Sequence, residues 1–494
     1  MNTPKKASVA QHFVRYALAN VLVLAAGFVS FPITTRLLSS DEFGVLSYWE
    51  SGMLVLVAIL KLGASDGAMR FYPHQGDANG MSRYATNMLA VPALMGLLGW
   101  ALVMVITAGA AATGWLDHPT VVFLALAQVL PLAWGALALR VLQAQERSGI
   151  NAALSVVWRW LTVGATVLVL LWVTASASGV LMAKLAVHIL VIGGLLVWLV
   201  PKLPVARSSF DWAEVKVGLH YGMPLALMEL SNIALWYIDR FMMKWLIDDF
   251  AVIGIYSIGF SLAIYVDQLI STALSQALTP VTTRVYATEG AAAVRAVKLR
   301  VMRPLVFICF ALSTGLIIAG HDFLTILASA DKASASPVFI TAGVFFLVRA
   351  MVWAAAEGLL LHKRSKTVFV LTIVAALANA GANFVLIPRF GMMGSVYATG
   401  LSVVGLQLLF FTFCPRELKV LPQGSVLLKA ALACAVCLGL SAETSLFGLV
   451  NHVARLGGAA ALVGAVFGAA MLTDANLRAV ALSVMRKLQG RAPA

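Results

Sequence analysis

The sequence has few charged residues: Asp, Glu, Lys and Arg make up 11% of its 494 residues, whereas soluble domains carry roughly 25%. Apolar residues account for 61%. A water-soluble chain of this composition would expose large apolar patches and aggregate. We therefore expect the chain to lie in a lipid bilayer, whose interior is itself apolar.

Cysteine is also scarce, with four residues in the whole chain. Cys434 and Cys437 form a C-x-x-C pair, but they lie inside the apolar run 426–446. A zinc site would need two further ligands nearby, so we interpret these cysteines as small packing residues and expect no metal site. The spacing of the four cysteines indicates no disulfide framework.

Several catalytic motifs are absent as well. The sequence has no G-x-x-x-x-G-K-[ST] loop, which argues against direct use of ATP, and no H-E-x-x-H or G-x-S-x-G motif. The segments between the apolar runs are too short to hold a catalytic domain. We therefore predict that the protein is not an enzyme and needs no cofactor.

What the sequence does contain is a series of apolar runs, each long enough to cross a bilayer core of roughly 30 Å as a helix. They fall at 14–36, 44–63, 86–110, 119–142, 150–173, 178–200, 219–246, 251–275, 301–320, 336–360, 367–388, 393–413, 426–447 and 453–473. The sequence thus predicts an all-α polytopic membrane protein with about fourteen spans. We expect residues 211–217 to lie at the membrane surface, and the longest loop, 276–300, to form an amphipathic helix.

The charges that are present have a strong bias. The formal net charge is +14, and 25 of the 35 Lys and Arg residues fall in alternate loops that include both termini. The intervening loops hold five, and the last five lie within spans or at their edges. By the positive-inside rule both termini are cytoplasmic, and nucleic acid is not needed to explain the basic charge. We expect the first apolar run to be an uncleaved helix.

The two halves of the chain resemble each other. Gly44 matches Gly254, Arg70 matches Arg284, and Arg147 matches Arg364, at offsets of 210, 214 and 217. The repeat unit is six helices, so both copies enter the membrane with the same orientation. We predict an N-terminal lobe at 1–205, a C-terminal lobe at 206–420, and a further pair of spans with a cytoplasmic tail at 421–494. Rocking of two lobes around a cleft would give alternating access.

Specific stretches resemble a known family. The opening "YALANVLVLAAGFVSFPITTRLLSSDEFGVLSYWE", the turn "LHKRS" and the segment "FVLIPRFGMMGSVYATGLS" are similar to bacterial polysaccharide-export flippases of the Wzx type. These flippases share a superfamily with the MATE multidrug exporters and the lipid II flippases. The resemblance covers roughly residues 11–415, and its motifs are structural rather than chemical.

The resemblance implies a function. Such proteins move an oligosaccharide repeat unit, linked to undecaprenyl pyrophosphate, across the bacterial inner membrane for O-antigen, capsule or exopolysaccharide assembly. Transport is coupled to an ion, H⁺ or Na⁺, and the implied partners are the lipid-linked oligosaccharide, membrane lipids, a polymerase and a chain-length regulator. The alternatives are a MATE-type multidrug exporter and, from another class, an intramembrane polymerase or acyltransferase.

Charged residues within the seventh span are the first candidates for a site. Glu229 and Arg240 are eleven residues apart, three turns plus about 20°, so they share one stripe, near which Lys244 also falls. In the resembled family this span borders the central cavity. Arg240 and Lys244 would then attract the anionic substrate, and Glu229 would bind the coupling ion. Internal salt bridges, with Lys244 reaching the interface, are the alternative. Asp239 points elsewhere on the helical wheel and is a further ion-coupling candidate.

Other spans supply the remaining candidates. Arg159 and Arg349 would bind the diphosphate, and Asp267 would couple the ion. Their alternative role is to pair with one another or with other charges on neighbouring helices. Arg70 and Arg284 are expected near the cytoplasmic mouth, where they would receive the head group or simply anchor the helices.

Overall fold

The computed structural model describes residues 9–73, 78–443, 451–475 and 477–478, and these residues form helices joined by short turns, with no strand among them. By contacts the chain divides into two compact units, unit 1 (Met1–Gly254) and unit 2 (Ile255–Ala494). These units are defined by contacts, whereas the predicted lobes are defined by the internal repeat. The boundaries of the lobes stay a prediction.

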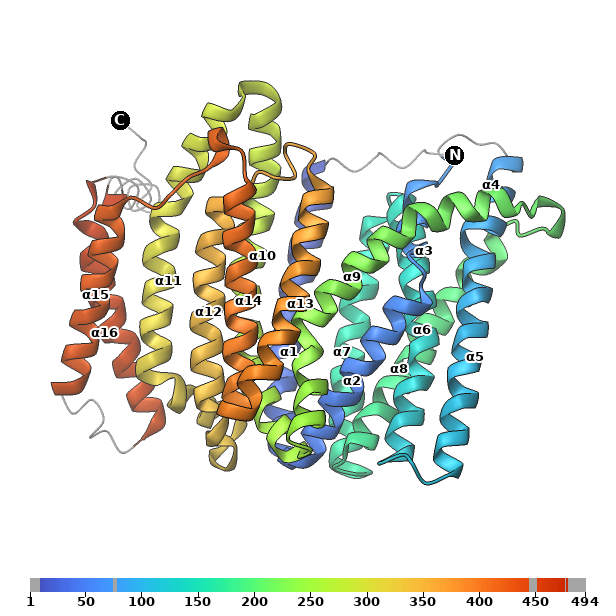
Figure 1. Ribbon diagram of the computed structural model, residues 1–494, viewed down its shortest axis with the longest axis horizontal. Coiled ribbons are helices and arrows are strands. Elements are labelled where there is room, and N and C mark those ends of the chain that lie inside the picture. Colours follow the sequence, from blue (N-terminus) through green and yellow to red (C-terminus); the bar gives the residue numbers. More distant parts are fainter. Residues whose placement is uncertain (1–8, 74–77, 444–450, 476, 479–494) are drawn as a thin grey trace. The chain divides into compact units, whose positions relative to one another are not determined.

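Unit 1 contains nine α-helices and the beginning of a tenth among its described residues (Figure 1). They are α1 (Val9–Leu37), α2 (Ser40–Leu60), α3 (Ala64–Arg70), α4 (Ala78–Tyr84), α5 (Val91–Ala112), α6 (Pro119–Ala144), α7 (Ser148–Trp172), α8 (Ala177–Leu199), α9 (Trp212–Leu246) and α10 (Phe250–Glu289), the last continuing into unit 2. A π-helical turn, η1 (Ala85–Ala90), leads into α5, and the 3₁₀ turns η2 (Val200–Lys202) and η3 (Arg207–Ser209) follow α8.

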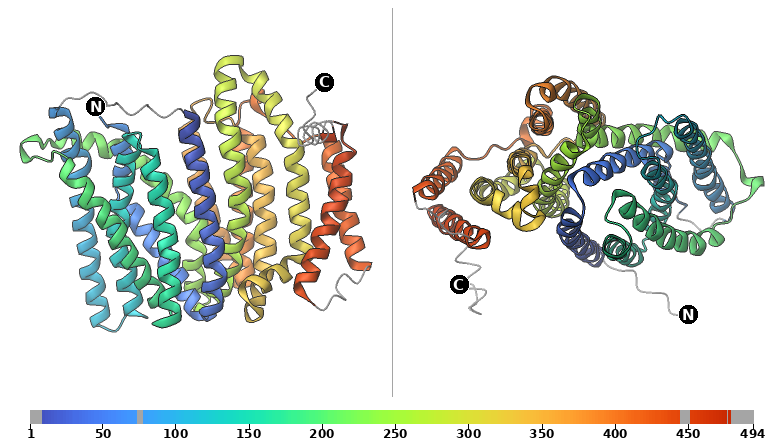
Figure 2. Two further views of the ribbon diagram at one scale, coloured as in Figure 1. Left: turned by 180° about the vertical axis from the view of Figure 1, so that it is seen from behind. Right: turned by 90° about the horizontal axis from the view of Figure 1, so that it is seen from below.

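The remaining helices belong to unit 2. They are α11 (Ala291–Ala328), η4 (Ala330–Ala335), α12 (Ser336–Ala356), α13 (Ser365–Phe390), α14 (Met392–Phe413), η5 (Arg416–Leu418), α15 (Gly424–Glu443) and α16 (His452–Leu472). Helix α14 packs against both α12 and α13, while α15 and α16 pack against α11. In the end-on view of Figure 2, α15 and α16 form a pair at the edge of this unit.

Among the described residues, thirteen helices are long and apolar enough to cross a membrane. Helix α9 is not among them; it is less apolar than the others and carries Glu229 and Arg240. With α9 added, the helices match the fourteen predicted apolar runs one for one. The all-α, polytopic fold is thus confirmed.

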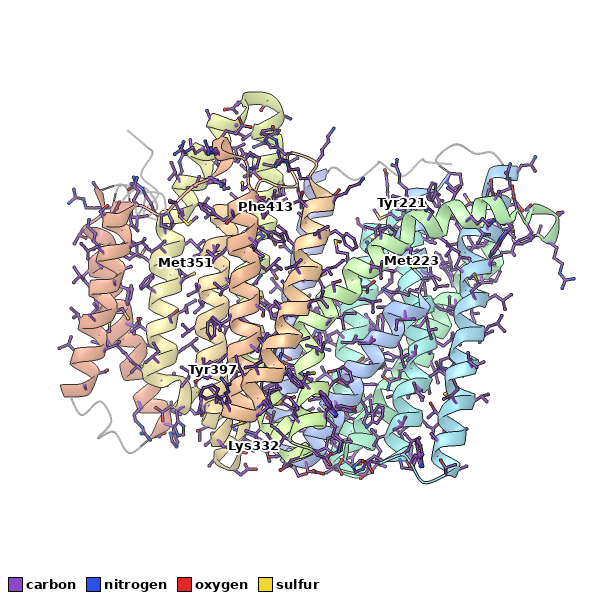
Figure 3. The ribbon with its side chains drawn as sticks, in the orientation of Figure 1. Tyr221, Met223, Lys332, Met351, Tyr397 and Phe413 are labelled. Atoms are coloured by element: carbon purple, nitrogen blue, oxygen red, sulfur yellow. The ribbon has the colours of Figure 1, made fainter. Side chains whose placement is uncertain are left out.

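Residues 211–217 begin a long helix: Asp211 caps α9, and the helix continues unbroken from Trp212. Their place at the membrane surface stays a prediction. Tyr221 and Met223, labelled in Figure 3, lie on this N-terminal part of α9. The prediction that residues 276–300 form a loop is wrong. They are the ends of α10 and α11, separated only by Gly290, whose φ of +82° favours glycine.

The family-like motif at the start of α2 is explained by helix caps. Ser39 accepts a hydrogen bond from the amide of Glu42 (3.1 Å), and acidic residues in the first turn favour the helix N-terminus. The Glu42 carboxylate in turn accepts from the amide of Ala177 (2.5 Å), at the start of α8. A Cβ on Gly44 would lie 1.8 Å from the carbonyl oxygen of Phe250. Glycine is therefore required where α2 meets the start of α10.

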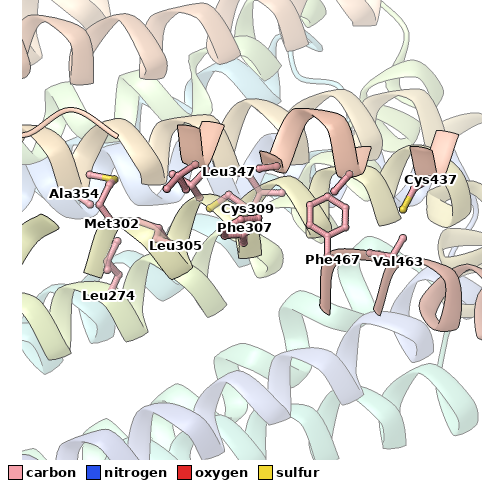
Figure 4. Packing of buried hydrophobic residues seen from close by; sticks show 14 of the residues in the cluster. Leu274, Met302, Leu305, Phe307, Cys309, Leu347, Ala354, Cys437, Val463 and Phe467 are labelled. Carbon is pink, nitrogen blue, oxygen red and sulfur yellow. The ribbon is translucent and has the colours of Figure 1, made fainter. Parts of the chain in front are cut away.

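The apolar core of unit 2 surrounds α11. Met302, Phe307 and Cys309 on α11 pack with Cys437 of α15 and Phe467 of α16 (Figure 4). Cys437 is fully buried and all four cysteines are free thiols. The prediction that the C-x-x-C pair serves packing is thus confirmed.

Candidate functional site

Glu229 and Lys61 form an ion pair inside unit 1. The Lys61 ammonium, at the C-terminal end of α2, donates to both carboxylate oxygens of Glu229 on α9 (2.7 and 2.9 Å). The Lys61 side chain is only 10% exposed, so the pair neutralises two charges that would be costly in an apolar setting. Glu229 shares its helix with Arg240, but its partner comes from another helix.

Asp239 and Arg240 are paired with each other. The Arg240 guanidinium donates to an Asp239 carboxylate oxygen (2.8 Å) and to the carbonyl oxygen of Trp236 (3.2 Å), and both charged side chains are buried. Asp239 and Arg240 leave the helix in different directions, yet their side chains meet. A helical wheel gives the direction of Cβ only, and the long arginine side chain folds back along α9.

Lys244 lies in the last turn of α9. Its ammonium is bonded to Asp248, lies 3.8 Å from Asp117, and stands over the Phe250 ring at 4.2 Å from the ring centroid. Two carboxylates and an aromatic face thus already surround this cation. A second interhelical pair joins Lys184 of α8 to Glu50 of α2.

Arg159 differs from these cations. It lies in the middle of α7, half-buried, and its Nε atom is buried without a hydrogen-bond partner. No ion pair of Arg159 occurs within the part of the chain that the structure describes. Its neighbour Trp158 packs edge-on against His188 of α8, with ring centroids 5.4 Å apart.

The candidates Arg349 and Asp267 meet inside unit 2. The Arg349 guanidinium on α12 donates to Asp267 (2.5 Å) and to Ser271 (2.8 Å), both on α10. Ser271 also donates to Asp267 (3.0 Å). The alternative role given to these residues, mutual pairing, is therefore what the structure contains.

Arg70 and Arg284 are both exposed. Arg70 ends the short helix α3 in unit 1, and Arg284 lies on the extended part of α10 in unit 2. Neither forms an ion pair with another described residue. Their positions at helix ends fit either expected role, and both roles stay predictions.

Unit 2 also contains a pocket of about 560 Å³, where α10, α14 and the turn after α12 come together. This volume is within the roughly 300–1,000 Å³ range of small-molecule sites. Glu357, which directly follows the span ending at Ala356, lines it together with Gln407 of α14 and Trp353. Phe413, labelled in Figure 3, lies about one helical turn beyond the part of α14 that lines the pocket.

Glu357 is held from two sides. One carboxylate oxygen accepts from Thr282 (3.2 Å), and the backbone carbonyl accepts from the ammonium of Lys298 (2.5 Å). Lys298, 1% exposed, also donates to the carbonyls of Ala355 (3.0 Å) and Leu418 (2.9 Å), so all its N–H groups are used. Burial raises the pKa of the Glu357 carboxyl above its ordinary value of 4.5, opposed by hydrogen bonds and by the charge of Lys298.

Neither Glu357, Lys298 nor Gln407 is among the candidate residues predicted from the sequence. Lys298 lies in the segment interpreted as a loop, where a lysine is explained by the positive-inside rule alone. Glu357 lies inside the predicted apolar run 336–360, and the helix in fact ends one residue before it. A lone acid near the end of an apolar run is the signal that could have identified it.

Comparison with known proteins bears on the whole chain. A family model described as polysaccharide biosynthesis protein matches residues 9–286. No curated protein sequence matches. Among solved structures, the lipid II flippase MurJ in an inward closed conformation has a TM-score of 0.73 at 12% identity, covering 93% of this chain and 98% of that chain.

Two multidrug resistance MATE family transporters of the MOP superfamily are also similar. The inward-facing structure has a TM-score of 0.57 at 16% identity and covers 88% of this chain and 99% of that chain. The outward-facing structure has a TM-score of 0.53 at 14% identity and covers 90% and 100%. At such identities these likenesses show the fold alone. Since the family model spans more than half of the sequence, this chain belongs to the polysaccharide biosynthesis protein family, and its fold is that of MurJ and the MATE transporters.

Proposed function

We propose that the protein is a flippase for an oligosaccharide repeat unit linked to undecaprenyl pyrophosphate. It would carry this lipid from the cytoplasmic to the periplasmic leaflet of the bacterial inner membrane, for O-antigen, capsule or exopolysaccharide assembly. Membership of the polysaccharide biosynthesis family and a fold shared with a lipid II flippase support a transporter of lipid-linked sugars. A polymerase and a chain-length regulator would act on the product.

The observation that carries the proposal is that Arg159 has no carboxylate partner among the described residues. A charged side chain in mid-membrane costs at least about 2.5–3.5 kcal/mol unless it meets a partner or water. Lys61, Lys184, Arg240 and Arg349 each have a carboxylate partner, whereas Arg159 has none within the described residues. A guanidinium is the side chain best suited to a diphosphate, which it binds through two parallel hydrogen bonds.

The paired carboxylates suggest how an ion would be coupled to transport. Glu229, Asp239 and Asp267 each balance a basic side chain. Binding of H⁺ or Na⁺ to one of them would weaken its pair and release the basic partner toward the substrate. The released cations, such as Arg240 and Arg349, would then bind the head group together with Lys244, Arg70 and Arg284. Two lobes, 1–205 and 206–420, would move so that the site opens to alternate sides of the membrane.

The orientation is testable independently. The charge bias supports cytoplasmic termini, which places the turn between α11 and α12 on the periplasmic side. A reporter fused after Asp331 should be active only in the periplasm. A cytoplasmic signal would refute this topology.

Transport itself can be measured in proteoliposomes that contain the purified full-length chain and a fluorescent undecaprenyl-pyrophosphate disaccharide. Arg159→Gln should stop translocation, and Arg159→Lys should retain part of it because the charge remains. Efflux of a cationic dye by the same vesicles would instead favour the MATE-type alternative. Normal translocation by Arg159→Gln would remove Arg159 from the substrate path.

A further inference from the structure

The pocket at the end of α12 contains two buried hydrogen-bond acceptors that accept no well-formed hydrogen bond. Gln407 is 5% exposed, and its Oε1 atom is buried without a hydrogen-bond partner among the described residues. The second carboxylate oxygen of Glu357 is also buried and accepts no well-formed hydrogen bond, although the Thr279 hydroxyl interacts with this carboxylate. Both residues line the pocket. A buried polar atom left unpaired costs about 1–3 kcal/mol, so the pocket is built to receive a molecule that brings donors.

The rest of the lining narrows the chemistry of that molecule. Trp353, Tyr286 and Phe410 supply aromatic surface, and Thr279 and Thr283 supply hydroxyl groups. Lys363 is the one basic side chain among the described residues that line the pocket, and the Glu357 carboxylate opposes any anion. A phosphate is therefore disfavoured. A ring with one apolar face and several hydroxyl groups fits both the aromatic surface and the orphan acceptors.

We propose that this pocket binds a sugar ring, with Gln407 and Glu357 accepting hydrogen bonds from its hydroxyl or amino groups. Lys298 is a positioning residue, because its bonds to the carbonyls of Ala355, Glu357 and Leu418 fix the turn that carries Glu357. The inference rests on the proposed function for its biological meaning: the ring is part of the carried oligosaccharide. In the proposed function the arginine candidates bind the diphosphate, so the sugar and the diphosphate would have separate sites.

The test uses the purified full-length chain in lipid nanodiscs and measures saturation-transfer NMR titrations with glucose, galactose, N-acetylglucosamine and glucuronic acid. At least one neutral or acetamido sugar should bind in the wild type. Gln407→Leu should weaken that binding about tenfold, the effect of one lost hydrogen bond. Gln128→Leu is the matched control: Gln128 is also a fully buried glutamine with an unpaired Oε1, but it lies on α6 in unit 1.

A second variant keeps the result interpretable if Gln407→Leu folds poorly. Glu357→Gln retains the shape of the side chain but removes its charge, so it should weaken binding of the neutral sugar and strengthen binding of glucuronic acid. A merely structural role for Glu357 would not reverse this preference. Lys298→Met should weaken binding of every sugar in the panel because the turn loses its anchor.

The outcomes separate this inference from the proposed function. Sugar binding that is absent in the wild type, or equal in Gln407→Leu and Gln128→Leu, overturns the inference, and the pocket then holds water only. If lipid-linked disaccharide is still translocated in proteoliposomes, the proposed function survives that failure. If a sugar binds as expected but no lipid-linked disaccharide moves, the pocket stands and the flippase proposal fails.

Discussion

The two units handle polar groups in apolar surroundings differently. In unit 1, charge pairs join α2 to α8 through Glu50 and Lys184, and α2 to α9 through Lys61 and Glu229. In unit 2, Lys298 instead binds three backbone carbonyls, and Arg349 with Asp267 joins α12 to α10. Among the described residues, both units contain buried acceptors without a donor, Gln128 in unit 1 and Gln407 in unit 2, but Arg159 in unit 1 has a buried unpaired Nε and no ion pair.

This difference separates structural charges from candidate functional ones. A charge that has its partner in the same unit is explained by the fold alone. A buried polar group without a partner in its own unit costs stability, and an external ligand would offset that cost. The following experiments test the distinction, from the largest expected effect to the smallest.

Arg349→Leu should have the largest effect on stability. The change leaves Asp267 buried and unpaired, which typically costs about 3–5 kcal/mol. Thermal unfolding in detergent, followed by intrinsic fluorescence, measures the loss. The double variant Arg349→Leu with Asp267→Asn should recover much of it, and equal stability of single and double variants would contradict the pairing.

Arg159→Leu should change stability in the opposite direction. Removal of an unpaired cation from mid-membrane should stabilise the fold by about 1–3 kcal/mol, part of the cost of placing arginine there. The same unfolding assay measures the gain, and translocation should be lost at the same time. A destabilised variant would mean that Arg159 supports the fold, as Arg349 does.

Lys61→Met should have a smaller effect. Glu229 is 37% exposed, so its charge remains partly solvated when the ammonium is removed. We expect a loss of about 1 kcal/mol, near the value of exposed pairs. Glu229→Gln is the reciprocal variant, and a loss above about 3 kcal/mol in either would show that this pair behaves as a fully buried one.

The smallest effect concerns the pH dependence of unit 2. A raised pKa means that folded Glu357 keeps its proton where the unfolded chain has lost it. The stability from this group is therefore fully present below about pH 4.5 and is lost as pH rises through the folded-state pKa. Melting temperatures of wild type and Glu357→Gln, measured against pH, should diverge above pH 4.5 in favour of the variant. Parallel curves would contradict a buried, perturbed carboxyl.

The spans were predictable from the sequence because the bilayer sets their length and composition, and each run contains that information locally. Pairing was not predictable, since Lys61 and Glu229 are 168 residues apart and no periodicity connects them. Asp267 and Arg349 were recognised as possible partners of each other only because the spans contain few charges. The pocket was missed because it depends on where α12 ends, and helix ends are the least certain part of such a prediction.

The hairpin of α10 and α11 has a practical consequence. Helices of 40 and 38 residues are about 60 and 57 Å long, nearly twice the hydrocarbon thickness, so the hairpin extends beyond the lipid (Figure 1). Open space surrounds Gly290 at its tip. A small rigid domain inserted there would give the protein an orientation marker for single-particle imaging, carried on two continuous helices.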